Sequence, residues 1–387
     1  MKKILISVAS ISVAIFIILG YKAFIFYKRI NTSKTVSSSS SIKKQEKKIY
    51  NILLLGYGGG SHDGTYLTDS MMVVHIDLSQ KKIAMISIPR DIWVKLPTKS
   101  GADFHEKINA VYQMGLNPDN YPDVDVKGEG QPAAADLIKR VIGPVFGLPI
   151  DNYVSIDFDG FKRAVDILGG VDVSVLKTFD DYEYPVDGKE KDLCGKTEAD
   201  LPELEKIASD SPSLAFPCRY EHLHFDQGTT HMNGETALKY VRSRHSLQDG
   251  SDFGRAARQQ RFLEAVKDKI ISPGFINKIV PLMDEMSTYI KTDIDIALFQ
   301  KFSPLIYKSK EFKNISIIPS YENYLKSSTS SYGGYILIPE TGIDNWEEVQ
   351  SWVKTSIITG SSLTPTPTPT KTPTPLAKPS IKTQTKK

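Results

Sequence analysis

Residues 51–91 read NILLLGYGGGSHDGTYLTDSMMVVHIDLSQKKIAMISIPRD and contain three short apolar runs. The first run, 51–56, ends in glycine and is typical of a buried strand. The second and third, 71–77 and 83–88, are joined by LSQKK and predict a strand hairpin. The glycine-rich segment 56–69 lacks the lysine of a phosphate-binding P-loop and is not followed by a helix, so it does not indicate a P-loop.

Strand and helix patterns alternate through the rest of the chain. This alternation favours one large α/β domain built as a layered sandwich. Helices are expected over residues 107–114, 133–146, 158–168, 233–240, 253–271, 275–290 and 295–308, with Asn233 as the N-cap of the fourth. Strands are expected over residues 153–157, 171–175, 315–318 and 335–338.

The formal net charge of +3 hides a basic–acidic–basic distribution. Residues 1–48 carry ten Lys or Arg and one Glu, and residues 360–387 carry five Lys and no acidic residue. The segment between them therefore has a formal net charge of −11. A general nucleic-acid surface needs a broad basic field, so we expect no nucleic-acid partner.

An uncharged apolar run at the N-terminus predicts a membrane anchor. Residues 4–20 read ILISVASISVAIFIILG, and the run extends through residue 27 if Lys22 reaches the interface. That length is enough for a tilted transmembrane helix. A cleaved signal peptide is the alternative, but no convincing small-residue cleavage site follows the run. We therefore expect residues 1–29 to hold a cytoplasmic start and a single-pass anchor.

Low-complexity segments bound the body of the protein. Residues 30–48 form a Ser/Lys-rich stalk, and residues 360–387 form a Pro/Thr/Lys-rich tail that is too poor in apolar residues to fold. Lys and Arg flank the anchor on both sides, but these spacers favour a body outside the cytoplasm, at the cell membrane. The body is expected over residues 49–359, with an insertion near residues 178–220, where periodicity is lost.

Cys194 and Cys218 are the two cysteines of the chain, and both lie in this insertion. In an exported protein, a pair that closes one loop favours a disulfide over two free thiols. Neither cysteine belongs to a CxxC motif, which argues against a zinc site.

Residues 240–261, YVRSRHSLQDGSDFGRAARQQR, gather five arginines. In the helix expected from residue 253, a single stripe begins with Arg255 and Gln259 and continues with apolar residues. These two side chains should therefore sit at the mouth of the core, at a helix N-terminus that favours anions. Arg258 can flank the same mouth.

Arg242 and Arg244 end the preceding helix, where cations offset the helix dipole. The alternative for the whole group is a solvated basic surface, and this alternative applies best to Arg261. It does not explain why Arg255 and Gln259 open an apolar stripe. Guanidinium groups bind phosphates through two parallel hydrogen bonds, so several of them in one pocket suggest a diphosphate.

Two aspartates could place a divalent cation beside such a diphosphate. Arg90 and Asp91 follow the third apolar run, at a strand end where α/β proteins place ligands. Asp69 precedes the second run. Because Mg²⁺ prefers oxygen ligands, Asp69 and Asp91 are the predicted metal ligands. The alternative is that both carboxylates only cap turns.

Seven stretches, in order along the chain, resemble the LytR-CpsA-Psr family of bacterial cell-wall glycopolymer ligases. They are NILLLG, LTDSMMVVHID, ISIPRDIWVKLP, KINAVYQMG, VSIDFDGFKRAVDILGGVDVSV, HMNGETALKYVRSRH and SDFGRAARQQR. The resemblance runs from about residue 51 to residue 271. It implies a membrane-anchored, extracytoplasmic α/β/α domain with a central mixed sheet. Such a domain binds a polyprenyl-linked pyrophosphate and moves the attached glycan phosphate to peptidoglycan or another wall acceptor.

The resemblance also implies roles for individual residues. Asp69 matches a metal-binding aspartate, with Mg²⁺ or Mn²⁺ as the cofactor. The predicted catalytic residues are Arg90, Asp91 and Arg255. Asp91 would orient or deprotonate the acceptor hydroxyl, and the alternative is that it is only a metal ligand. The predicted pyrophosphate ligands are Arg90, Lys107, Arg242, Arg244, Arg255, Arg258 and Gln259, with Asp252 supporting them.

Two positions depart from the family pattern. The family usually has an aspartate soon after the first Leu-Gly and an arginine two residues before Asp69. This chain has Tyr-Gly at residues 57–58 and leucine at Leu67. His62 and Asp63, within the glycine-rich segment, are the candidates to replace the missing ligand.

A prenyl tail would need an apolar channel. The candidate lining residues are Val73, Val154, Ile156, Phe262, Leu263 and Val266. The alternative, which applies to most of them, is an ordinary position in the hydrophobic core. Two other functions stay open: a pyrophosphatase that uses water as the acceptor, and a non-catalytic envelope regulator or wall-binding protein. No HEXXH or GXSXG motif or Cys-His pair supports a protease or an esterase.

Overall fold

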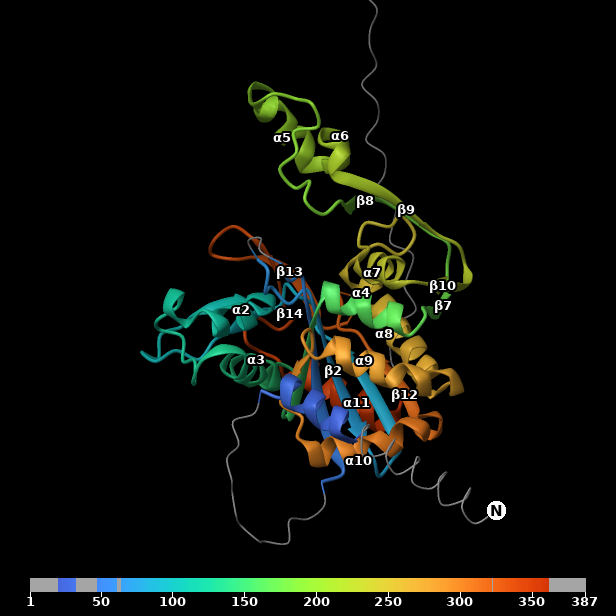
Figure 1. Cartoon of the computed structure of the whole chain (residues 1–387). Helices are drawn as coiled ribbons and strands as arrows, with labels where there is room; N and C mark the ends of the chain where they lie inside the picture. Colours follow the sequence, from blue (N-terminus) through green and yellow to red (C-terminus); the bar gives the residue numbers. More distant parts are fainter. Residues whose placement is uncertain (1–19, 33–46, 61–63, 322, 362–387) are drawn as a thin grey trace, which may run out of the picture.

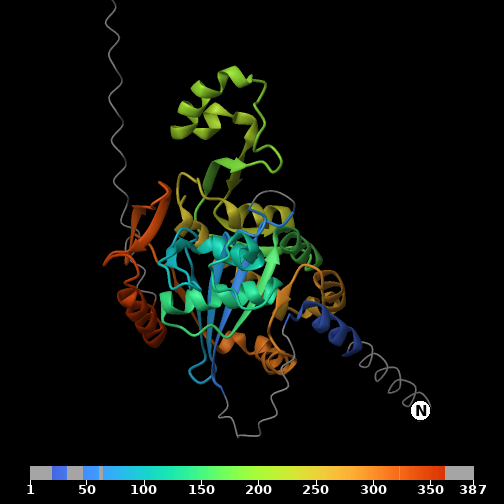
Figure 2. The same ribbon diagram turned by 90° about the vertical axis from the view of Figure 1, so that its left-hand side faces the viewer.

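The structure is a computed structural model that describes residues 20–32, 47–60, 64–321 and 323–361. Its centre is a six-stranded mixed sheet with the order β11-β6-β1-β2-β3-β12. Helices cover both faces of this sheet (Figure 1 and, turned by 90°, Figure 2). The strands are β11 (Lys291–Thr292), β6 (Asn152–Asp157), β1 (Ile49–Tyr57), β2 (Ser70–Asp77), β3 (Lys82–Ser87) and β12 (Lys313–Ile317).

The three apolar runs of residues 51–91 form the middle of the sheet. β1 pairs with β2 and β2 with β3, both antiparallel, so that Leu53, Val73 and Ile86 lie in one row across the strands. All three side chains are completely buried. The predicted hairpin is thus confirmed. β6 and β12 add parallel partners on the outer sides of β1 and β3, which makes the sheet mixed.

One face of the sheet is covered by α2 (Val111–Leu116), α3 (Gly130–Phe146) and α11 (Glu347–Thr359). The helices α2 and α3 approach closely at Gly115. A Cβ atom on this glycine would lie 2.4 Å from the Cα of Ala134, so a larger residue would force the helices apart. Apolar side chains of these helices and of the sheet form the larger hydrophobic core.

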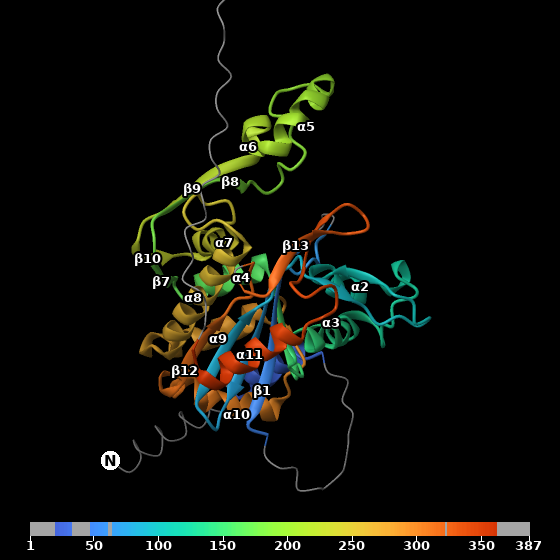
Figure 3. The same ribbon diagram turned by 180° about the vertical axis from the view of Figure 1, so that it is seen from behind.

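Further helices lie on the opposite side: α4 (Phe158–Ile167), α7 (Gly234–Arg242), α8 (Asp252–Ile271), α9 (Ile279–Met286) and α10 (Ile296–Tyr307). In Figure 3, α8 lies on the other side of the sheet from α3. Asn233 caps α7 as predicted, because its side chain accepts the backbone N–H of Thr236 at 2.9 Å. A second hydrophobic core joins α4, α7 and α8 to β7 (Val171–Val175) and β10 (Gly228–Met232).

Two predicted strands form but pair outside the central sheet, and one predicted helix start needs correction. The strand predicted over residues 171–175 forms, but β7 pairs with β10 outside the central sheet. The strand at residues 335–338 is β14 (Tyr335–Pro339), and it pairs with β13 (Leu325–Thr329). Lys107 does not begin a helix. It ends β5 (His105–Lys107), which pairs with β4 (Trp93–Lys95), and a short 3₁₀ turn separates it from α2.

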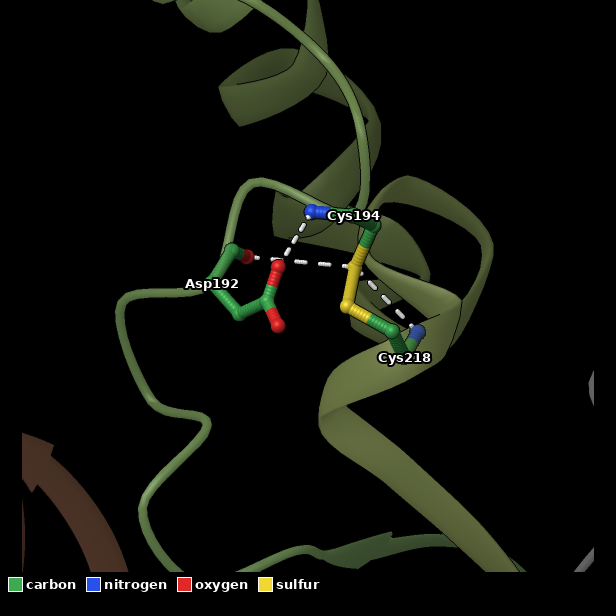
Figure 4. Close-up of side chains that lie close together, drawn as sticks. All are labelled: Asp192, Cys194 and Cys218. Carbon is green, nitrogen blue, oxygen red and sulfur yellow. Dashed lines mark hydrogen bonds between the residues drawn. A yellow bond between two sulfur atoms is a disulfide. The ribbon is translucent and has the colours of Figure 1, made fainter.

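An arm rises from the body between β8 (Phe179–Pro185) and β9 (Tyr220–Phe225), which pair as an antiparallel ribbon (Figures 1 and 3). Its outer part carries α5 (Leu201–Asp210), α6 (Pro212–Ala215) and two short 3₁₀ turns. A disulfide joins Cys194 to Cys218, with a sulfur–sulfur distance of 2.11 Å (Figure 4). The predicted cysteine pairing is therefore confirmed.

Residues 20–30 are helical and contact the body through Lys22, whose ammonium pairs with Asp284. Within the described part of the chain, none of the helices combines the length and the apolar character that crossing a bilayer requires. Most of the predicted anchor, most of the stalk and nearly all of the C-terminal tail fall outside the described residues.

Candidate functional site

Four arginine side chains line one cavity of about 340 Å³, here called the arginine cavity. They come from three separate parts of the chain. Arg90 follows β3, Arg242 ends α7 and Arg244 lies two residues beyond it, and Arg255 lies in the first turn of α8. The other lining residues are Asp69, Ser70, Phe158, Asp181, Glu183, Tyr184, Pro185, Tyr220, Val241, His245 and Gln259.

The start of α8 places Arg255 at the cavity. Ser251 caps the helix, since its hydroxyl accepts the backbone N–H of Gly254 at 3.0 Å. One turn later, Gln259 reaches the same cavity. The stripe that begins with Arg255 and Gln259 thus opens onto a cavity at the N-terminal end of α8, where we expected it.

Arg255 is unusually buried for an arginine, with 7% of the residue exposed to solvent. Burial lowers its pKa to about 10; the positive charges of Arg244 and Arg90 act in the same direction, and Asp252 opposes them. Asp252 is shared, because its Oδ1 lies 3.1 Å from Arg255 Nη2 and 3.0 Å from Arg244 Nε. A bound anion would relieve the repulsion among these arginines.

Arg90 links the two predicted metal ligands. Its Nη1 lies 3.0 Å from Asp69 Oδ1, and its Nε lies 3.3 Å from Asp91 Oδ2. Burial opposes the charged form of Arg90, but Asp69, Asp91 and Asp252 outweigh it and raise its pKa. The guanidinium is therefore firmly charged and held in place at the cavity wall.

Asp91 and Lys107 are not among the residues that line the arginine cavity. Asp91 is 5% exposed, and its Oδ1 lies 2.7 Å from Lys107 Nζ while Oδ2 faces Arg90. Both oxygens of this carboxylate thus face cations. Asp91 and Lys107 support Arg90 from behind instead.

Arg258 does not line the arginine cavity either. Its side chain is completely buried away from the cavity, and its guanidinium lies over the ring of Phe179. It donates hydrogen bonds to the backbone oxygens of Tyr240 and Ser243 and to Asp249 Oδ1, the last at 2.6 Å. Arg258 therefore ties α8 to the segment after α7 and is not a ligand of the cavity.

Asp69 is the predicted metal ligand that faces the arginine cavity. Its Oδ1 accepts hydrogen bonds from Arg90 and from the Asn109 amide at 3.4 Å. Among the described residues, the groups of three or more potential ligands include neither Asp69 nor Asp91. One carboxylate beside an anion site fits a magnesium ion whose other ligands are phosphate oxygens and water.

Tyr57 stands where the family pattern usually has an aspartate, and the structure shows its surroundings. Tyr57 ends β1 as a buried side chain stacked near Tyr112, with ring centroids 6.2 Å apart. Burial raises the pKa of Tyr57 far above its usual range, so it does not replace a carboxylate. His62 and Asp63 lie outside the described residues.

The base of the arm forms a wall of the arginine cavity that the sequence did not predict. Tyr184, Pro185 and Tyr220 belong to this wall, and the Tyr184 hydroxyl accepts a hydrogen bond from Arg242 Nη1 at 3.1 Å. Residues 178–220 lack periodicity, so no sequence signal joined them to the site. His245, in contrast, could have been found from the sequence, because it directly follows the paired arginines in VRSRH.

An apolar cavity of about 260 Å³ adjoins the arginine cavity. The two share the lining residues Ser70, Phe158, Val241, Arg242 and Gln259. Four predicted channel residues line the apolar cavity, namely Val154, Ile156, Phe262 and Leu263. Val73 instead belongs to the core of the sheet, and Val266 lines a further cavity of about 360 Å³, here called the distal cavity.

Comparison with known proteins agrees with this architecture. Teichoic acid transferase TagV of Bacillus subtilis (strain 168), named as acting from polyisoprenyl-teichoic acid to peptidoglycan, is 29% identical over 83% of this chain and 72% of its own. Biofilm regulatory protein A of Streptococcus mutans serotype c is 27% identical over 87% and 73%, respectively. The crystal structure of B. subtilis TagV superposes with a TM-score of 0.52 and 27% identity, covering 81% of this chain and 99% of that chain.

A family model described as the LytR_cpsA_psr family matches residues 19–337, a span that includes every described residue of the arginine cavity. The chain therefore belongs to the LytR_cpsA_psr family.

Proposed function

We propose that the protein transfers a glycopolymer, together with its proximal phosphate, from a polyprenyl-pyrophosphate carrier to peptidoglycan or another wall acceptor. The observation that carries this proposal is the junction of the two cavities. A cavity lined by four arginines adjoins an apolar cavity, and the two share five lining residues. This arrangement suits a ligand with a diphosphate head and a hydrocarbon tail. The name of the relative TagV supports the same class of reaction.

In this proposal the arginines bind the diphosphate and stabilise the charge that develops on the leaving prenyl phosphate. Arg255 and Arg244 share one counter-charge, Asp252, and so have unmet affinity for a further anion. Arg90 is held by Asp69 and Asp91 in a fixed orientation. A magnesium ion at Asp69, when bound, would neutralise further charge on the phosphate oxygens.

The prenyl tail would follow α8 away from the arginines. One face of this helix lines the arginine cavity with Arg255, the apolar cavity with Phe262 and the distal cavity with Ile270. Leu263 lines both apolar cavities and so forms the wall between them. We place the first isoprene units in the apolar cavity and later ones in the distal cavity.

We also propose that the body works outside the cytoplasm on an N-terminal anchor. The apolar run of residues 4–20 and the disulfide of the arm support this topology. A reporter fused after Lys387 that needs an extracytoplasmic location should be active. Activity of a reporter that works only in the cytoplasm would contradict this topology.

The function is tested by turnover of a prenyl-pyrophosphate glycan by the full-length protein, with Mg²⁺ and a peptidoglycan acceptor. Arg255→Ala should lower the rate by roughly 10²–10³, the cost of removing one charge-stabilising donor. Arg261→Ala is the matched control, because Arg261 does not line the cavity and its Nε lies 3.5 Å from the Tyr240 hydroxyl. Full activity of Arg255→Ala would refute the pyrophosphate site.

A further inference from the structure

An imidazole and a carboxylate meet at the wall of the arginine cavity. His245 Nδ1 lies 3.4 Å from Glu183 Oε2, and both residues line the cavity. His245 follows Arg244 directly in the chain, whereas Glu183 belongs to β8 at the base of the arm. The pair thus joins the segment that carries the paired arginines to the inserted arm.

One buried carboxylate holds the backbone of both partners. Asp181 Oδ2 accepts the backbone N–H of His245 at 3.1 Å, and its Oδ1 accepts the backbone N–H of Glu183 at 2.9 Å. The Glu183 side chain has a further support, because its Oε1 accepts a hydrogen bond from the Ser213 hydroxyl of α6 at 3.1 Å. The pair is therefore built into the cavity wall.

The other acidic groups of this wall are already engaged. Asp181 accepts four hydrogen bonds, from the Ser243 hydroxyl and three backbone N–H groups. Asp69 pairs with Arg90. The His245 side chain is 52% exposed, so a bulky polymeric acceptor can reach it from solvent.

We propose that His245 is the general base of the transfer reaction and that Glu183 is its positioning residue; this inference rests on the proposed function. With Glu183 beside Nδ1, the tautomer that carries its hydrogen on Nδ1 is favoured, which leaves the lone pair of Nε2 for the acceptor. The acceptor hydroxyl oxygen forms a bond to the glycan-proximal phosphorus, and its proton passes to Nε2. The bond from that phosphorus to the bridging oxygen breaks, and prenyl phosphate leaves with the electron pair.

The test uses the full-length protein with a prenyl-pyrophosphate glycan and peptidoglycan. His245→Ala should lower kcat by about 10²–10⁴, the usual contribution of a general base, while the affinity for the lipid stays within about twofold. Added imidazole should restore part of the rate. His224→Ala is the matched control: His224 also pairs with an aspartate on the arm, Asp180, but does not line the cavity.

Glu183→Gln distinguishes positioning from structure. It should lower kcat in the native background and have no further effect in His245→Ala, because Glu183 acts through the ring. Full kcat in both His245→Ala and His245→Gln would overturn the proposal, as would a loss confined to lipid affinity. If the wild-type protein binds the lipid but transfers nothing, the proposed function itself is refuted. If the wild-type protein transfers the glycan and the His245 variants do so equally fast, only the role of His245 is refuted.

Discussion

The Asp181 carboxylate accepts the backbone N–H of Arg244, with Oδ2 and N 3.1 Å apart. It thereby fixes the segment that carries one arginine of the cavity. We expect Asp181→Asn to lower the free energy of unfolding by about 1.5–3 kcal/mol, the worth of a hydrogen bond to a charged group. Urea denaturation would measure this loss. Unchanged stability would show that the carboxylate does not hold this segment.

The contribution of Asp181 to stability should also depend on pH. Burial raises the pKa of Asp181, but hydrogen bonds from Ser243 and from neighbouring backbone N–H groups outweigh it, and the pKa is lowered overall. A lowered folded-state pKa stabilises the protein above the unfolded pKa, and this stabilisation is lost as the pH falls. The stability difference between wild type and Asp181→Asn should therefore be full at neutral pH and shrink in acid. A difference that grows in acid would contradict this assignment.

Arg258 should matter for folding and not for the ligand. Arg258→Ala removes a buried cation, leaves two backbone oxygens without their donor and takes from Asp249 its paired cation, so we expect a loss of about 3–5 kcal/mol in unfolding free energy. The fraction that stays folded should bind the prenyl-pyrophosphate lipid normally. Normal stability combined with a loss of lipid binding would instead make Arg258 a ligand-binding residue.

The sequence predicted the parts of the fold that depend on local pattern. The apolar runs of residues 51–91 gave the three central strands and their hairpin, and the Asn233 cap marked the start of α7. Pairing between strands that are far apart in the sequence leaves no such local pattern. The strand at residues 171–175 was therefore found without its partner β10.

The same limit applies to the site. The helical stripe of α8 placed Arg255 and Gln259 correctly at a cavity mouth. Arg258 has the same charge and a neighbouring position, but its partners are backbone oxygens of another segment, which residue identity does not reveal. Glu183 was missed because the arm that carries it is irregular in sequence.

The disulfide should stabilise the arm. The small core of the arm, formed by Leu204, Ala215 and Phe216, is backed by few other apolar side chains. Replacing Cys194 and Cys218 by serine should therefore cost about 3 kcal/mol on the chain-entropy model. Thermal unfolding of oxidised protein and of the double variant measures this cost. Two reactive thiols in the unfolded, non-reduced protein would contradict the bond.

Carrier length should reveal the use of the distal cavity. Val266→Trp fills part of this cavity, so it should raise the KM of a long-chain carrier by about tenfold or more, given roughly 0.8 kcal/mol per buried CH₂ group. The KM of a carrier with only two isoprene units should stay unchanged. Equal effects on both carriers would place the damage in the first apolar cavity or in the fold.

The central claim is transfer to an acceptor, and its most direct measurement is a product balance. The full-length protein is given a prenyl-pyrophosphate glycan with labelled sugar, and both the prenyl phosphate released and the glycan bound to peptidoglycan are counted. We predict one glycan attached for each prenyl phosphate released at saturating acceptor, and loss of both products in Arg255→Ala. Release of prenyl phosphate without attachment of the glycan would contradict the transferase account and identify a hydrolase.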